Sequence, residues 1–552
     1  MNNKLEIEKL NKEVERLKKE LKKKKKYGLV WEEKPEELVE MCKEKLPVLK
    51  EVKNKEIITD KDKPVNLLIE GDNYHALSVL NYTHNKKIDV IYIDPPYNTG
   101  NKDFIFNDHY VDKEDSYRHS KWLSFMEKRL RLAKNLLKDT GVIFISIDDN
   151  EIAPLRLLTD QIFNDGNIDI MVWRKSGDGR DGKMKNTTTF RKDHEYVIVG
   201  FKNKRILNKI LEKPNFQNVY DNIDNDLRGP YKAGSISRRE DASNPKHKNF
   251  YTVKSPSGKK FTRQFDIPQE EFELLNKDGR IYWGKNNNSV PAIKIFINEQ
   301  REITPYSVLL TKGTTTGGKE ELRELFNLKD TDEDIFSNPK PTLLIKTLIQ
   351  LGSKKESIIV DFMAGSGTTG HAVMKLNKED GGNRKFILCT DNQDNNGSGL
   401  KIAEDICYPR IKKVIEGYKN LKGEKVEGLG GNLKYFKTNF VEYDEPTDKN
   451  KIKLTKQATD MLCVKEETFE LVRDGEDFKI FKNHDHYTGI IFDQVAISAF
   501  KKAIKDIKDK FSVYIFSLGD ETFGDEFEDI KQKVQLSPIP EAILRVYRRI
   551  FK

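Results

Sequence analysis

Residues 88–97 of this chain read Ile88-Asp89-Val90-Ile91-Tyr92-Ile93-Asp94-Pro95-Pro96-Tyr97. The first six form an apolar, β-branched run of the kind that lies buried in a parallel sheet. Two successive prolines end such a strand, since each fixes φ and lacks a backbone donor. They leave an acid, Asp94, and an aromatic ring, Tyr97, at the carboxyl end of the strand. Open α/β sheets bind ligands at this edge, so the stretch predicts both the fold class and a candidate site.

A second strand, turn and helix start lie far downstream. They read Ile358-Ile359-Val360-Asp361-Phe362-Met363-Ala364-Gly365-Ser366-Gly367-Thr368-Thr369-Gly370. Gly365 and Gly367 would let the backbone approach a ligand closely, and Thr368 and Thr369 would stand at the amide-rich helix start. One helix length later, a further apolar strand ends in Asp391, an acid suited to a ribose diol. From these residues alone, the turn could equally hold a dinucleotide or no ligand.

Asp94-Pro95-Pro96-Tyr97 resembles the motif of the DNA amino-methyltransferases, which methylate exocyclic amines of adenine or cytosine. Asp361-Phe362 before Ala-Gly-Ser-Gly resembles the cofactor turn of the same family, which uses S-adenosylmethionine. The tetrapeptide comes first in the chain, an order similar to the β group, in which target recognition is inserted between the two motifs. Such a permutation leaves the chemistry intact, because strand order in a sheet is not chain order. Further segments that resemble this group are Gly141–Asp149, Phe190–Val199 and Asn338–Pro341.

The resemblance implies roles for individual residues. Asp94 and the carbonyl of Pro95 would accept hydrogen bonds from the target amine, and Tyr97 would stack on a flipped base; with Pro96 these form the predicted catalytic set. Asp72, in Gly71-Asp72-Asn73 after a short strand, would contact the cofactor adenine, although alone it is better explained as a turn residue. The predicted cofactor pocket comprises Asp72, Lys340, Pro341, Asp361, Phe362, Ala364, Gly365, Gly367, Thr368, Thr369 and Asp391.

More narrowly, the chain resembles the modification subunit of type III restriction–modification systems, or a solitary relative. This implies site-specific methylation of adenine N6 in double-stranded DNA by base flipping, and as partners a second copy and a restriction (helicase/nuclease) subunit. Asp as the first motif residue favours adenine over cytosine N4, where Ser is frequent. A non-catalytic DNA-binding specificity subunit and a nicotinamide oxidoreductase stay open as alternatives, the latter disfavoured because no hydride-transfer residues accompany the glycine turn.

Composition agrees with a polyanionic partner without requiring one. Lys and Arg total 98 against 89 Asp and Glu, which gives a net charge of +9. The 4 cysteines are scattered, so we expect neither disulfides nor a metal site, and a reducing, cytoplasmic location. No apolar run approaches the length of a membrane span. Gly313–Lys319 matches most of the phosphate-binding loop motif, but the motif requires Ser or Thr where this chain has Glu320. This difference disfavours nucleotide hydrolysis.

The predicted fold is a Rossmann-like methyltransferase sheet of the α/β class with permuted motif order, an inserted target-recognition domain and a small C-terminal α/β domain. The expected boundaries are 1–40 for an N-terminal helix, 41–175 for the catalytic half, 176–337 for the insert, 338–442 for the cofactor half and 443–552 for the C-terminal domain. Apolar residues at three-four spacing predict either a short coiled coil or a solvated helix at the N-terminus: Ile7, Leu10, Val14, Leu17 and Leu21.

Overall fold

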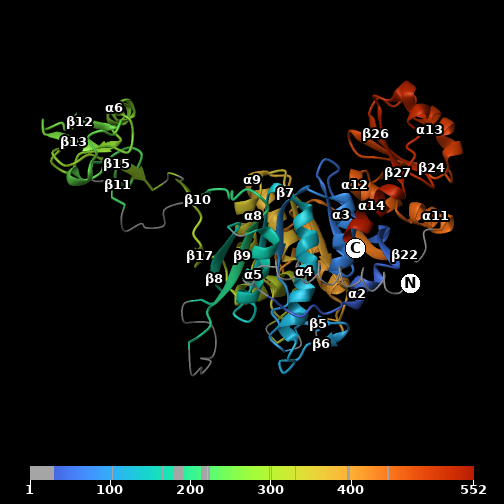
Figure 1. Cartoon of the computed structure of the whole chain (residues 1–552). Coiled ribbons are helices and arrows are strands. Elements are labelled where there is room, and N and C mark those ends of the chain that lie inside the picture. Colours follow the sequence, from blue (N-terminus) through green and yellow to red (C-terminus); the bar gives the residue numbers. More distant parts are fainter. Residues whose placement is uncertain are drawn as a thin grey trace, which may run out of the picture. The chain divides into compact units, whose positions relative to one another are not determined.

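The computed structural model describes residues 30–551, apart from 102, 165, 178–189, 213–219, 222–223, 298, 300, 330, 395–397 and 444–446. It consists of two compact units (Figure 1). The smaller unit is Asn208–Pro305, and the larger one reaches Leu207 and resumes at Tyr306. The predicted N-terminal coiled coil, from Ile7 to Leu21, lies outside the described residues.

The larger unit is built on an 11-stranded sheet in the order β1-β22-β3-β19-β18-β4-β7-β9-β8-β17. Its strands are β1 (Lys45–Glu51), β22 (Asn432–Glu442), β3 (Val65–Glu70), β19 (Lys385–Thr390), β18 (Ile358–Asp361), β4 (Ile88–Ile93), β7 (Leu137–Ile147), β9 (His194–Phe201), β8 (Ile168–Arg174) and β17 (Val308–Leu309), with β2 (Ile57–Ile58) beside β22. The six strands from β22 to β7 are parallel, whereas β9 runs antiparallel to both β7 and β8. The predicted parallel α/β sheet is confirmed.

Helices cover both faces of this sheet. Figure 1 shows α3 (Asn73–Thr83), α4 (Arg118–Leu136) and α5 (Ile152–Phe163) over one face. On the other face, α8 (Thr342–Gly352) packs against α9 (Thr368–Asp380), which also contacts α10 (Tyr408–Glu416). The alternation of β4 explains the two layers: Ile91 and Ile93 join the core beneath α3 and α4, whereas Val90 faces Gly352 at the end of α8. The strand is therefore buried on both sides, as its apolar sequence predicts.

Shorter elements complete the larger unit. They are α2 (Glu37–Met41), the β5 (Ile105–Phe106) and β6 (His109–Tyr110) hairpin, α7 (Thr315–Phe326), a π-helical turn at Ile402–Cys407, and the β20 (Gly417–Lys419) and β21 (Lys425–Glu427) hairpin. All four cysteines carry free thiols in the protein interior.

The smaller unit has its own core. Its strands are β10 (Ile210–Glu212) with β16 (Arg301–Ile303), β11 (Tyr231–Ser235) with β15 (Ala292–Phe296) and β14 (Ile281–Tyr282), and β12 (Phe250–Lys254) with β13 (Lys260–Gln264). Helix α6 (Gln269–Lys277) contributes Phe272 to a cluster with Phe265 and Trp283, in which every member belongs to this unit. The unit can therefore bury apolar surface without help from the rest of the chain.

The predicted insert, 176–337, is wider than this unit. Strands β9 and β17 fall inside the predicted range, yet both belong to the main sheet. Helix α7 also falls inside it and packs on α10 of the larger unit. The compact unit is therefore narrower than the predicted insert on both sides.

The C-terminal region forms a 5-stranded sheet, β23 (Glu470–Asp474), β24 (Phe478–Lys482), β25 (His486–Ile491), β26 (Lys510–Phe516) and β27 (Val534–Ile539), with helices α11 (Asp448–Gln457), α12 (Thr459–Glu466), α13 (Ile497–Ala503) and α14 (Glu541–Ile550). The region contains both strands and helices, as predicted for it. Met461, Leu544 and Tyr547 share one core with α3 and β1, and Tyr547 donates a hydrogen bond to the carbonyl of Pro47.

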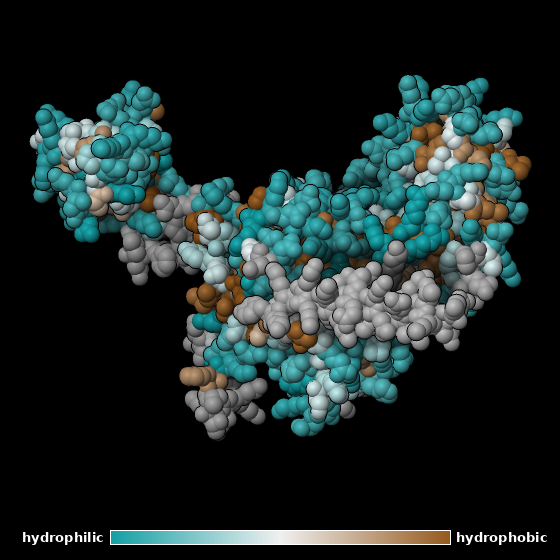
Figure 2. Space-filling view, viewed as in Figure 1, coloured by the Kyte–Doolittle hydropathy of each residue, from teal (hydrophilic) through white to brown (hydrophobic). Residues whose placement is uncertain are grey.

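Apolar side chains also reach the surface in this region. Figure 2 shows a mainly hydrophilic face with brown patches over the C-terminal region, whose exposed residues include Val472, Val495 and Leu518. Within the described ranges, no helix combines the length and the apolar character that a membrane span requires.

Candidate active site

Four neighbouring parallel strands, β3, β19, β18 and β4, each end at or just before an aspartate. These are Asp72, two residues after β3, then Asp391 after β19, Asp361 at the end of β18, and Asp94 after β4. Pairing of Ile359 with Val90 sets β18 directly beside β4, although the two strands lie far apart in the sequence. The expectation that the tetrapeptide and the glycine turn share one edge of the sheet is confirmed. The roles predicted for the individual residues stay predictions.

Asp94 lies in a cluster of charged and hydroxyl groups. The Lys340 ammonium donates to both of its carboxylate oxygens, Oδ1 at 2.9 Å and Oδ2 at 2.8 Å. The same ammonium lies 3.5 Å from Oε2 of Glu195, the second residue of β9. The Tyr97 hydroxyl is 3.0 Å from Asp94 Oδ1 and 3.0 Å from Glu195 Oε2, so its single hydrogen can be donated to either carboxylate.

The cluster is electrically balanced. The Lys175 ammonium lies 3.2 Å from Glu195 Oε1, so two lysines face two carboxylates. Burial is the largest influence on the pKa of Asp94 and, with the nearby Glu195 carboxylate, raises it despite the contact with Lys340. Burial also acts to raise the pKa of Glu195, but the two lysines outweigh it and lower that pKa. For Lys340, the carboxylates of Asp94 and Glu195 overcome the effect of burial and raise the pKa.

Asp94 is the more accessible of the two carboxylates in this cluster. Its side chain is 25% exposed, against 9% for Lys340 and 10% for Glu195. A ligand can therefore reach the Asp94 carboxylate, while the other two charges are held by protein contacts.

Two contacts fix the loop that carries the tetrapeptide. The indole Nε1 of the buried Trp122, on α4, donates to the Pro96 carbonyl at 2.7 Å. The buried Asn98 has a φ of 55° and donates to Glu151 Oε1 at 2.6 Å. The same oxygen lies 2.6 Å from Nδ1 of His119. Burial raises the pKa of Glu151 despite these contacts.

The glycine turn is held from within by Asp361. Its Oδ1 accepts from the Met363 amide at 3.0 Å, and its Oδ2 accepts from the Thr369 hydroxyl at 2.5 Å. Burial raises the pKa of Asp361 to about 7, a shift that these hydrogen bonds only partly offset. Gly365 and Gly367 have φ values of 49° and 80°, in the left-handed region that favours glycine. Residues with side chains would not readily adopt the backbone conformation of this turn.

The threonine hydroxyls at the start of α9 are already engaged by the protein. Thr369 holds Asp361, and Thr368 Oγ1 accepts from the buried Arg410 guanidinium at 2.8 Å. Phe362 is fully buried, and the Ala364 amide donates to the Cys389 carbonyl at 3.1 Å. These side chains build the turn, so they hold its backbone in shape and are not free to bind a ligand themselves.

Asp72 caps α3 and faces a buried cation. Its Oδ1 accepts from the Tyr74 amide at 2.7 Å, and its Oδ2 lies 3.5 Å from Arg129. Arg129 is paired in turn with Glu36, which comes just before α2. Asp391 lies close enough that the charge of Asp72 adds to burial in raising the pKa of Asp391 to about 6. The two acids predicted to hold adenine and ribose are therefore neighbours.

Lys340 and Pro341 lie where α8 begins, as expected. Pro341 is the N-cap residue of α8, and Gly313 approaches it closely. The Lys340 side chain, however, contacts the Asp94 carboxylate, which places it in the predicted catalytic set rather than with the cofactor residues alone.

Sequence reasoning missed several residues of the site. Glu195 and Lys175 are the most important, since they complete the Asp94 cluster. One signal was available: Glu195 is an acid directly before the apolar residues Tyr196–Val199, which indicates a buried cation nearby. Its partner could not be read from the sequence, because Lys340 is distant in the chain.

The segment that resembles a phosphate-binding loop, Gly313–Glu320, forms the start of helix α7. Thr314 caps α7 by accepting from the Gly317 amide, and Gly318 packs against the Pro339 carbonyl. Gly318 therefore lets α7 approach the segment that carries Lys340. Among the described residues, no group of three or more His, Cys, Asp or Glu side chains is arranged to hold a metal ion.

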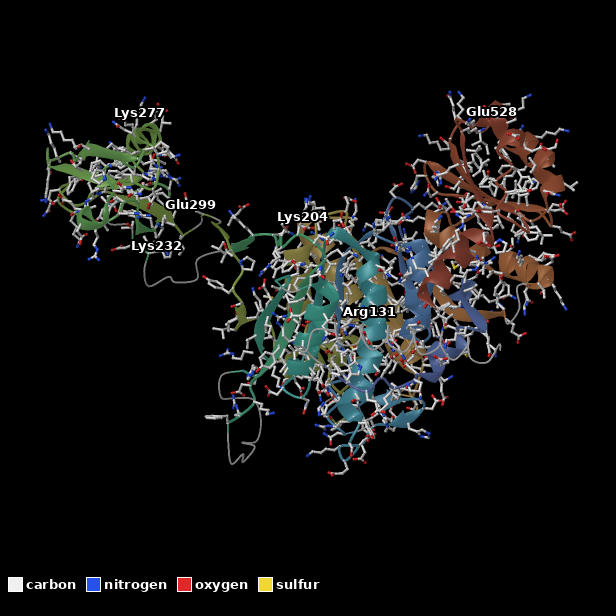
Figure 3. All side chains as sticks on the ribbon, in the orientation of Figure 1. Arg131, Lys204, Lys232, Lys277, Glu299 and Glu528 are labelled. Carbon is white, nitrogen blue, oxygen red and sulfur yellow. The ribbon has the colours of Figure 1, made fainter. Side chains whose placement is uncertain are left out.

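The basic and aromatic residues of the smaller unit divide into two sets. Tyr231 and Trp283 are buried in its core, and Arg228 is paired with Asp226 and Asp278. The exposed set includes Arg238, Arg239 and Lys285. Figure 3 shows Lys232 and Lys277 among the charged side chains that this unit carries.

Comparison with known proteins identifies the family. A family model described as DNA methylase matches residues 88–396. The StyLTI Mod subunit of Salmonella typhimurium, a type III restriction-modification enzyme, is 34% identical over 63% of this chain and 57% of its own length. The type II methyltransferase M.KpnI of Klebsiella pneumoniae is 32% identical over 65% of this chain and 89% of its own length. The EcoPI Mod subunit of Escherichia phage P1 is 30% identical over 64% of this chain and 62% of its own length.

The chain thus spans less than two thirds of the Mod subunits that it matches. The matched family region nevertheless begins at β4 and extends past Asp391, so it includes both the tetrapeptide and the glycine turn. The chain belongs to the DNA methylase family.

Proposed function

We propose that this protein transfers a methyl group from S-adenosylmethionine to adenine N6 in double-stranded DNA, as the modification and specificity subunit of a restriction–modification system. The observation that carries the proposal is the adjacency of β4 and β18, which sets Asp94 beside the glycine turn at one sheet edge. An acceptor for an amine and a pocket for a nucleoside cofactor then share that edge.

The residues of the tetrapeptide suit an exocyclic amine. Its lone pair is delocalised into the base, so the amine becomes nucleophilic only if its N–H groups are drawn out of the ring plane. The exposed part of the Asp94 carboxylate and the Pro95 carbonyl supply acceptors for those hydrogens. The Tyr97 ring would stack on the base after it leaves the duplex, and the Trp122 contact fixes the loop for this task.

The pocket residues fit S-adenosylmethionine. A Cβ at Gly365 would come within 3.0 Å of Phe336, and one at Gly367 within 3.0 Å of Cys407, so the turn offers backbone where a side chain has no room. Asp72 and Asp391 are neighbouring acids that would accept from the adenine amine and the ribose diol. The sulfonium of the cofactor supplies an activated methyl group, so no metal is needed.

The names of the relatives suggest further assignments. The Mod subunits are parts of type III enzymes, from which we propose a restriction subunit as partner, and we retain the homodimer and the cytoplasmic location as predictions. Cytosine N4 is the alternative target, because the same acceptors would serve its amine. Asp94 in place of Ser favours adenine. The smaller unit, Asn208–Pro305, is the proposed recognition module.

The test is transfer of labelled methyl from S-adenosylmethionine to unmethylated DNA, comparing the wild type with Asp94→Ala. Digestion of the product to nucleosides identifies the modified base. N6-methyladenine from the wild type and its loss in the variant would establish the reaction, whereas N4-methylcytosine would change only the target. Cofactor binding without transfer to any DNA would support the non-catalytic alternative.

A further inference from the structure

The Lys340 ammonium occupies the hydrogen-bonding positions that the target amine needs. It donates to both oxygens of Asp94, at 2.9 and 2.8 Å, and these are the acceptors that the proposed function assigns to the base. A carboxylate has room for further donors, so binding of the amine is compatible with a nearby lysine. A cation held on both oxygens nevertheless weakens them as acceptors, because it withdraws the negative charge that the amine should meet.

The positive charge that develops on the amine during the reaction makes Lys340 still less favourable beside Asp94. As the N–C bond forms, the C–S bond breaks and its electron pair leaves with sulfur. The amine nitrogen becomes positive until one of its protons passes to water. A lysine fixed on Asp94 would oppose that charge in a site of low dielectric. The Asp94 carboxylate therefore serves the transition state best when Lys340 is turned away from it.

The structure contains a second acceptor for Lys340. Glu195 Oε2 is 3.5 Å from the same ammonium, and Tyr97 can donate to either carboxylate from 3.0 Å. Because Glu195 already lies this close, the ammonium can leave Asp94 and remain paired with Glu195. Glu195 reaches no ligand itself, since its side chain is 10% exposed and lies between Lys175 and Lys340.

We propose that Glu195 is a positioning residue that acts through Lys340, drawing the ammonium off Asp94 when the target amine engages that carboxylate. The inference rests on the proposed function. In the free enzyme, the Lys340 ammonium binds the Asp94 oxygens that the amine would use. In the complex with DNA, it binds Glu195 instead. The exchange leaves the cluster neutral at every stage, with Asp94 and Glu195 balanced by Lys340 and Lys175.

This charge balance predicts an unusual pattern among variants. Glu195→Gln leaves one excess positive charge and confines Lys340 to Asp94. Lys340→Met leaves one excess negative charge in a buried site, which favours protonation of Asp94 and so removes the acceptor that the amine needs. The double variant restores neutrality and frees the Asp94 carboxylate, since Lys175 then balances Asp94 alone. Adding Lys340→Met to Glu195→Gln should therefore restore part of the methyl-transfer rate that Glu195→Gln loses.

The test is a double-mutant cycle on the single-turnover rate of methyl transfer, with saturating labelled S-adenosylmethionine and a DNA substrate that the wild type methylates. Glu195→Gln and Lys340→Met should each lower the rate about tenfold or more, and the double variant should be faster than Glu195→Gln by a similar factor. Glu195→Asp, which keeps the charge, should recover most of the wild-type rate.

The matched control is Glu466→Gln, in the C-terminal region. Glu466 also accepts from a tyrosine, Tyr514 at 2.6 Å, and lies 3.5 Å from a lysine, Lys465. It should leave the transfer rate unchanged while lowering stability as much as Glu195→Gln does. Losses that multiply in the double variant would overturn the inference, as would a Glu195→Asp rate as low as that of Glu195→Gln. A wild type that methylates no DNA would instead refute the proposed function on which the inference rests.

Discussion

The Arg129 guanidinium donates to both carboxylate oxygens of Glu36, at 2.9 and 2.6 Å, and the pair is almost completely buried. Glu36 stands just before α2, whereas Arg129 lies in the middle of α4. Arg129 also contacts Asp72, the cap of α3. One buried cation therefore connects the N-terminal segment to an acid of the proposed cofactor pocket.

Glu36→Gln should lower the free energy of unfolding by about 3–5 kcal/mol, because it leaves a buried guanidinium without its principal partner. We expect weaker cofactor binding as well, since Arg129 would turn toward Asp72. Urea unfolding and calorimetry measure the two effects. The control is Glu127→Gln on the same helix, which breaks a surface pair with Arg131 (Figure 3) and should change stability by less than about 1 kcal/mol. Equal effects of the two substitutions would contradict the prediction.

Stability should depend on pH through Asp361. Its pKa is about 7 in the folded protein because of burial and 3.8 ordinarily, so the folded state binds the proton more tightly. The contribution of this group to stability is full below pH 3.8 and is lost as the pH rises toward 7, at a slope that approaches about 1.4 kcal/mol per pH unit.

Asp361→Asn removes the titrating group, so the variant should lose less stability than the wild type between pH 5 and pH 8. Urea unfolding of the cofactor-free protein at both ends of this pH range measures the difference in stability. Parallel pH profiles for the two proteins would show that burial does not hold the Asp361 proton.

Gly367→Ala should weaken cofactor binding more than it weakens folding. A Cβ there would lie 3.0 Å from Cys407 Sγ, at a φ of 80°. Gly423→Ala is the control, because Gly423 has a φ of 78° and open space around its Cβ position. Both substitutions carry a backbone cost of about 1 kcal/mol, but only Gly367→Ala intrudes on the glycine turn. Calorimetric titration with S-adenosylmethionine tests this, and similar affinities for the two variants would contradict it.

Removal of residues 443–552 should destabilise the main sheet. Met461, Leu544 and Tyr547 belong to the core that includes α3 and β1, so truncation would expose that apolar surface to water. The truncated chain should aggregate or show a lowered unfolding temperature. Deletion of Asn208–Pro305 is the comparison, since the core cluster of that unit contains only its own residues. A stable, soluble truncation at 442 would refute the shared core.

Sequence reasoning succeeded where local chemistry determines structure. The run Ile88–Ile93 followed by two prolines fixes both a buried strand and its end, and the glycines at 365 and 367 occupy the left-handed conformations that their turn requires. It is limited where distant segments meet. Nothing in the residues next to Lys340 predicts that its ammonium contacts Asp94. Glu195 was missed for the same reason, since its role comes from partners outside its own strand.

The position of Asn208–Pro305 in the chain has an evolutionary consequence. The unit leaves after β9 and returns before β17, at the end of the sheet farthest in strand order from β3, and its apolar cluster is self-contained. Replacing it would alter neither the register of β4 with β18 nor any residue of the Asp94 cluster. A lineage could therefore exchange this unit as a cassette, and with it the DNA preference proposed for the unit, while the Asp94 cluster stays unchanged.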